Sequence, residues 1–104
     1  MTTYTDRENI EYCQGVAADV EEAWESGELS EWLDQALEVE VISTLDGTYR
    51  GAHVYVTLGG PSVYVDTECG SVILTHSGGY ADWDIYGRAV DGLDELIEEI
   101  FNCR

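Results

Sequence analysis

The chain has 104 residues, with 22 aspartates and glutamates against four arginines and no lysine, so its formal net charge is −18. A surface this acidic lacks the cationic footprint that nucleic-acid phosphates require, and it is not attracted to an anionic membrane leaflet. With 44% hydrophobic and 11% aromatic residues, the chain is too apolar for a disordered acidic tail. We therefore expect one compact domain over residues 1–104.

From the sequence we expect neither a membrane span nor a secretory signal. No stretch approaches the roughly 20 apolar residues of a membrane span, and the N-terminus lacks the basic and apolar regions of a secretory signal. Three cysteines, an odd number, fit free thiols in a reducing compartment. One disulfide with one free thiol is the alternative. These features predict a cytoplasmic protein.

The acidic residues are distributed unevenly along the chain. Residues 1–40 hold 12 of the 22, residues 82–104 hold 7, and residues 41–81 hold only 3. Seven of the 11 glycines lie between Gly47 and Gly79. This distribution predicts two acidic helical ends around a neutral centre that is rich in turns.

The first segment has the period of an amphipathic helix. Thr5 and Glu8 form a capping-box pattern at its start, and Gly27 is a plausible end. Apolar residues recur three or four positions apart on one face, at Ile10, Cys13, Ala17, Val20 and Trp24. A second, shorter helix is expected from about Glu28, with an apolar stripe of Leu29, Trp32, Leu33, Ala36 and Leu37.

The centre changes to a period of two, which is typical of β-strands. Four strands are predicted, over residues 38–41, 53–58, 63–66 and 72–75, the first of them half-buried, with a hairpin signal at Asp46-Gly47. The expected core face consists of Val54, Val56, Leu58, Val63, Val65, Val72 and Leu74. The opposite face would carry His53, Tyr55, Thr57, Tyr64 and Asp66.

The last quarter of the chain returns to helix. Residues 77–79 are expected to end the sheet, and residues 80–87 are expected to be irregular. A final helix is predicted from about Arg88, with Val90, Leu93, Ile97 and Ile100 turned inward. The predicted fold is therefore α+β, a four-stranded antiparallel meander covered on one face by helices, in the order α-α-β-β-β-β-α.

Patterns for catalysis, metals or cofactors are weak. A thiol nucleophile needs an electropositive setting, and the negative field around Cys13, Cys69 and Cys103 opposes it. No cysteine or histidine pair has zinc-ligand spacing, and Asp82-Trp83-Asp84 is only a poor calcium candidate. We expect no catalytic residue, no metal site and no cofactor.

The acidic helix faces need a further explanation. Like charges three or four residues apart destabilise a helix, and a net charge of magnitude about 2–8 is enough for solubility. One explanation is a high-salt cytosol, where the Debye length falls to about 3 Å at 1 M. The other is recognition, because carboxylates with this spacing can take the place of successive phosphates on a basic protein.

The acidic residues form four groups: Glu8/Glu11, Asp19/Glu21/Glu22/Glu25, Glu28/Glu31/Asp34 and Asp94/Glu95/Glu98/Glu99. With these groups the chain resembles small acidic anti-defence proteins of phages and mobile elements, namely anti-CRISPR proteins and antirestriction DNA mimics. A protein of this class would act in the cytoplasm of the host cell. The resemblance is one of class, without a diagnostic motif. It implies a Cas effector or another defence nuclease as partner, inhibited without catalysis through its basic nucleic-acid-binding surface.

The leading hypothesis places the contacts on the acidic helices. The expected partner-binding residues are Glu21, Glu22, Glu25, Glu28, Glu31 and Asp34, then Asp94, Glu95, Glu98 and Glu99, with Tyr55, Tyr64 and Trp83 as aromatic anchors. Three alternatives stay open: an acidic adaptor or immunity-like protein for a basic partner, a small ligand-binding or enzymatic domain that uses His53, Tyr55 and Tyr64, and a halophilic housekeeping domain. The tyrosine-rich face, or Trp24 and Trp32, could also form a homodimer surface.

Overall fold

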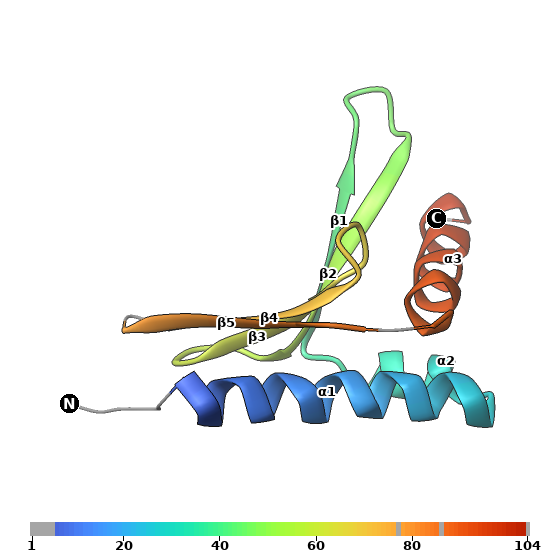
Figure 1. Cartoon of the computed structure of the whole chain (residues 1–104). Helices are drawn as coiled ribbons and strands as arrows, with labels where there is room; N and C mark the ends of the chain where they lie inside the picture. Colours follow the sequence, from blue (N-terminus) through green and yellow to red (C-terminus); the bar gives the residue numbers. More distant parts are fainter. Residues whose placement is uncertain (1–5, 77, 86, 104) are drawn as a thin grey trace.

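The computed structural model describes residues 6–76, 78–85 and 87–103. Two helices precede a sheet and one helix follows it (Figure 1). The helices are α1 (Asp6–Ser26), α2 (Leu29–Asp34) and α3 (Ala89–Asn102). The strands are β1 (Glu38–Ser43), β2 (Tyr49–Thr57), β3 (Ser62–Asp66), β4 (Ser71–His76) and β5 (Gly79–Asp84). The α+β class predicted from the sequence is confirmed.

The five strands form one antiparallel meander in the order β1-β2-β3-β4-β5. The predicted turn at Asp46-Gly47 joins β1 to β2, and Gly47 has a φ of +91° that only glycine adopts without strain. The Asp46 carboxylate accepts hydrogen bonds from the hydroxyl groups of Thr44 and Thr48 and from the Thr48 backbone N–H. These bonds, led by the one from Thr44, lower the pKa of Asp46.

The sheet is bent, and the helices lie on one side of it (Figure 1). α1 runs beneath β4 and β5, whereas α3 stands beside β2 and contacts the C-terminal half of α1. β1 and the first half of β2 extend as a hairpin, which we call the arm (residues 38–54). We call the rest of the molecule the body. α1, α2 and α3 leave the opposite side of the sheet uncovered, and we call that side the open face.

The core lies between the helices and the sheet. Its fully buried side chains include Leu74, Leu93, Val20, Val54, Val63, Val65, Val72 and Cys13. α1 and α3 approach closely at Gly92, where an added Cβ would lie 2.6 Å from Cε3 of Trp24. Gly92 is unfavourable in a helix on intrinsic propensity, and this contact explains why the position carries no side chain.

The prediction of four strands was wrong, because residues 79–84 form a fifth strand and are not irregular. β5 pairs with β4 from Ser71↔Asp84 to His76↔Gly79. Its sequence mixes aromatic, small and acidic residues, and only Ala81 of the strand is buried. A strand with so little apolar periodicity forms because β4 offers it a complete hydrogen-bonding edge. The sequence of residues 79–84 does not contain this information.

Several apolar residues expected in the core are exposed. Leu58 follows the end of β2 and is 48% exposed, Leu37 follows the end of α2 and is 61% exposed, and Ile100 on α3 is 56% exposed. Trp24 is only partly covered, at 42% exposure. β1 was expected to be half-buried, yet Val39 and Val41 are both exposed, because α3 packs beside β2 and β1 lies at the edge of the sheet.

Two further points concern the ends of the molecule. Thr5, the first residue of the predicted capping box, lies outside the described residues. Gly27 has a φ of +76° and follows α1 directly, which confirms it as the end of that helix. Among the described helices, none combines the length and apolar character that crossing a bilayer requires.

Candidate functional site

Three of the six acidic residues predicted as partner contacts near the end of α1 and in α2 line one open hollow. Glu22, Glu28 and Glu31 line it together with Asp19 and Trp32, at the place where the end of α1 meets α2. Ser26 Oγ donates a hydrogen bond of 3.1 Å to Glu28 Oε1. Glu25 and Asp34 are also exposed, and Glu21 is half-buried. The short loop between the two helices thus brings separate carboxylates to one surface.

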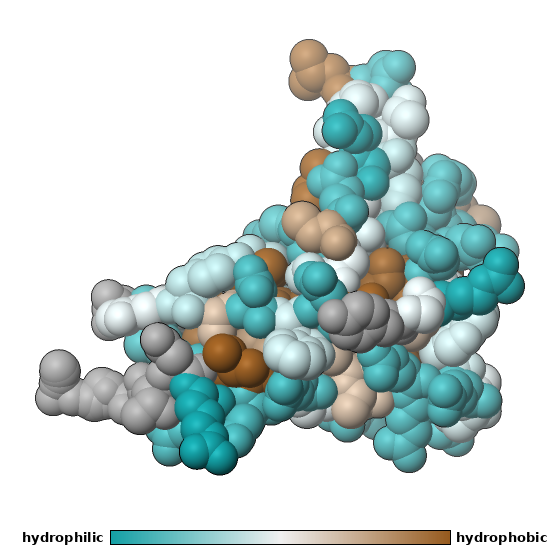
Figure 2. Space-filling model, viewed as in Figure 1, coloured by the Kyte–Doolittle hydropathy of each residue, from teal (hydrophilic) through white to brown (hydrophobic). Residues whose placement is uncertain are grey.

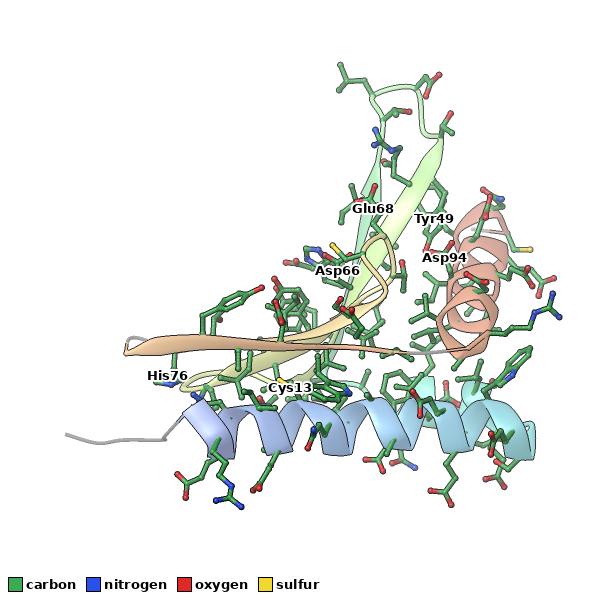
Figure 3. All side chains as sticks on the ribbon, in the orientation of Figure 1. Cys13, Tyr49, Asp66, Glu68, His76 and Asp94 are labelled. Atoms are coloured by element: carbon green, nitrogen blue, oxygen red, sulfur yellow. The ribbon has the colours of Figure 1, made fainter. Side chains whose placement is uncertain are left out.

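The acidic residues of α3 divide into two groups. Glu95, Glu98 and Glu99 are exposed. Asp94 is half-buried, and its Oδ1 accepts a 2.7 Å hydrogen bond from the Tyr49 hydroxyl on β2 (Figure 3). Burial, followed by this bond, raises the pKa of Tyr49. Asp94, proposed as a partner contact, therefore also has a structural role between α3 and the arm.

The open face carries a cluster of aromatic and acidic side chains (Figure 3). His53 lies with Nε2 3.3 Å from Asp66 Oδ2 and Nδ1 3.8 Å from Glu40 Oε1. The ring centroid of Tyr64 is 4.6 Å from that of His53 and 5.0 Å from that of Tyr55. The structure therefore brings together the residues of the alternative ligand-binding hypothesis, which lie on β2 and β3.

The three predicted aromatic anchors do not lie together. Paired residues of antiparallel strands point to the same side of a sheet. Tyr55 pairs with Tyr64 on the open face, but Trp83 pairs with the buried Val72 and is on the helix side. Trp83 is 37% exposed at the edge strand β5. A partner that binds one face of the sheet would therefore not contact both Trp83 and the two tyrosines.

The open face is acidic, which the distribution along the sequence concealed. Strand pairing places Glu38 and Glu40 of β1, Asp66 of β3, and Asp82 and Asp84 of β5 on it. The expectation of a neutral sheet was therefore wrong. The signal that could have found these residues is the spacing of two in Glu38-x-Glu40 and Asp82-x-Asp84, which puts both acids of each pair on one face of a strand.

Burial and nearby acids raise the pKa of the tyrosine hydroxyls on this face. Burial and the nearby Glu40 raise the pKa of Tyr55, whose hydroxyl lies 3.4 Å from Glu40 Oε1. Burial and Asp66 raise the pKa of Tyr64. Tyr80 Oη donates to Asp82 Oδ2 at 2.9 Å. Neutral aromatic rings beside carboxylates form a surface that suits cationic side chains, especially arginine.

Positive charge is scarce in the chain as a whole. Within the described ranges, arginine side chains form two ion pairs, Arg7 with Glu11 at 3.4 Å and Arg50 with Glu68 at 3.6 Å. Both pairs are well exposed, and such pairs contribute only about 0–1 kcal/mol each. Arginine therefore neutralises only a small part of the negative charge of the chain.

The thiols lack the setting of a nucleophile. Cys13 is buried in the core, and burial raises its pKa from 9.0 to about 11. A hydrogen bond from Cys69 Sγ to Asp66 Oδ2, 3.4 Å long, raises the pKa of Cys69. Both shifts disfavour the reactive thiolate. The described residues include no group of three or more cysteine, histidine, aspartate or glutamate side chains placed to hold a metal ion.

Comparisons with protein-family models, with curated proteins and with solved structures find no match for this chain. The site must therefore be interpreted from its own geometry.

Proposed function

We propose that this protein is a non-enzymatic inhibitor that binds the basic nucleic-acid-binding surface of another protein and keeps nucleic acid away from it. The observation that carries the proposal is the gathering of Glu22, Glu28 and Glu31 around one hollow, in a chain that has 22 acidic residues and only four arginines. A partner of this kind would be a bacterial defence nuclease complex, with CRISPR–Cas effectors first, as the class resemblance implies. Electrostatic steering would make association fast and dependent on salt.

The first test is competition. Purified protein is added to a panel of Cas effectors, and DNA cleavage is measured together with the release of a fluorescent guide or target strand. We expect cleavage to fall for a responsive effector, and added DNA or guide RNA to displace the inhibitor. Uninhibited cleavage at saturating protein across several effector types would contradict the proposal. Binding that nucleic acid cannot displace would instead indicate an acidic adaptor.

A matched pair of variants tests where the contact lies. The triple change Glu22→Gln, Glu28→Gln and Glu31→Gln and the triple change Glu95→Gln, Glu98→Gln and Glu99→Gln each remove three negative charges from exposed positions. We expect the first to weaken inhibition by about tenfold, equal to 1.4 kcal/mol, and the second to weaken it less. Equal losses would show that net charge, and not the hollow between α1 and α2, determines binding.

A second candidate function follows from the acids on both sides of the sheet. Carboxylates on α1 and α3 and on the open face together suit a housekeeping domain of a high-salt cytosol, where screening relieves repulsion. Such a domain would unfold when salt is removed. We expect the inhibitor to remain folded at about 0.1 M salt, where the Debye length is about 10 Å. Circular dichroism across a salt series separates the two.

A further inference from the structure

β1 is an edge strand with two unusual features. One of its edges has no partner strand among the described residues, and one of its faces carries exposed valines. It pairs along one edge with β2, and within the described chain no strand follows on its other edge. An unpaired edge presents backbone N–H and C=O groups that another strand can bind. The arm holds this edge away from α1 and α2 (Figure 1), so an added strand would not collide with them.

The side chains of β1 alternate in chemistry between the two sides. Glu38 and Glu40 pair with Tyr55 and His53 and lie on the open face. Val39 and Val41 pair with Val54 and Ala52 on the helix side, where they are 38% and 37% exposed. Figure 2 shows hydrophobic residues along the arm and at its tip, within a surface that is otherwise mostly hydrophilic. An added strand would cover the two valines.

The charge of the strand decides what can bind there. A second copy would bring its own Glu38 and Glu40 next to those of the first, and like charges on neighbouring strands are destabilising. Two chains of net charge −18 also repel each other at longer range. The occupant that fits is a strand in which lysine or arginine alternates with apolar residues. Its cations would face the glutamates, and its apolar side chains would cover the valines.

We propose that β1 is the docking edge for a basic, alternating β-strand of the partner, which extends the sheet to six strands. The proposal rests on the proposed function, since it names the segment of the basic partner that is bound. Backbone hydrogen bonds would supply affinity, and the alternation of Glu38-Val39-Glu40-Val41 would supply register and specificity. The acidic residues between α1 and α2 would then contact other parts of the partner.

The test uses the full chain and three synthetic peptides. The first is Lys-Val-Lys-Val-Lys-Val-Lys. The second has the same composition with its four lysines before its three valines, and the third is the first with all internal backbone nitrogens methylated. We expect the first peptide to bind at least about tenfold more tightly than the other two. Amide NMR shifts and protection from hydrogen exchange should concentrate at residues 38–43.

Equal affinities for the three peptides, or shifts confined to the helices, would overturn the docking edge. The double variant Val39→Thr and Val41→Thr keeps the net charge and the β-propensity of the strand, and we expect it to weaken binding of the first peptide about fivefold. Ile100→Thr, at an exposed position of α3, is the matched control and should change nothing. The comparison between the first and the methylated peptide uses the unmodified protein. It therefore tests the docking edge even if the double variant unfolds.

Sedimentation of the protein alone tests the other occupant, because dimerisation through residues 38–43 would overturn the choice of a basic partner strand. The docking edge and the proposed function can fail separately. Peptide docking at β1 without inhibition of any effector would remove only the proposed function. Inhibition that is fully kept by the Val39→Thr and Val41→Thr variant would remove only the docking edge.

Discussion

Two regions of the sheet share one sequence pattern and have opposite fates. Val63-Tyr64-Val65 in β3 and Val39-Glu40-Val41 in β1 both alternate valine with a larger polar or aromatic residue. Val63 and Val65 are fully buried over α1, whereas Val39 and Val41 are exposed on the arm. Alternation therefore determines which face of the sheet a side chain points to. Whether that face is buried depends on whether a helix packs against it. The body is stabilised by packing, and the arm carries the proposed docking edge.

The largest expected effect is a loss of stability in the core of the body. Leu93 on α3 is fully buried between the helices and the sheet. We expect Leu93→Ala to lower the free energy of unfolding by about 3 kcal/mol, because it removes apolar contacts and leaves a cavity. Denaturant unfolding monitored by tryptophan fluorescence measures the change. A loss below about 1 kcal/mol would contradict the core described above.

An intermediate effect is expected where the arm contacts α3. Tyr49 begins β2, packs against Phe101 with ring centroids 5.9 Å apart, and donates its hydroxyl hydrogen bond to Asp94. We expect Tyr49→Phe to cost about 1 kcal/mol of stability, since a half-buried carboxylate loses its donor. Hydrogen exchange should quicken in the arm more than in β3 and β4. Uniform quickening would mean that the bond does not act locally.

The same variant has a predictable pH dependence. The pKa of Tyr49 is raised from 10.0 in the folded protein. Its stabilising contribution is therefore complete below pH 10 and is lost as pH rises above 10, because the unfolded state releases the proton first. The stability gap between the native protein and Tyr49→Phe should narrow above pH 10, by no more than about 1.4 kcal/mol per pH unit. A gap that widens there would contradict the assigned hydrogen bond.

The smallest expected effect lies at the tip of the arm. Leu45 is fully exposed in the connection between β1 and β2. We expect Leu45→Ser to change stability by less than about 0.5 kcal/mol, as is usual for surface positions without special contacts. Denaturant unfolding beside Leu93→Ala provides the comparison. A loss of 1 kcal/mol or more would show that the tip is covered in solution.

Local sequence determined much of this protein. The period of α1, the end of that helix at Gly27, the turn at Asp46-Gly47 and the alternation of β2 to β4 are all encoded within about ten residues of each site. Hydrogen bonding and side-chain direction repeat at fixed intervals along helices and strands, so a pattern shows its element without knowledge of the rest. The strong negative charge is likewise a property of composition alone.

Tertiary structure decided what depends on a distant neighbour. β5 exists because β4 supplies an edge, Val39 and Val41 are exposed because α3 packs beside β2 and not beside the edge strand β1, and Asp94 is engaged because β2 brings Tyr49 to it. Strand pairing also placed acids from both ends of the sequence on the open face. Burial and charge proximity depend on how separate segments meet in space, which no local period records.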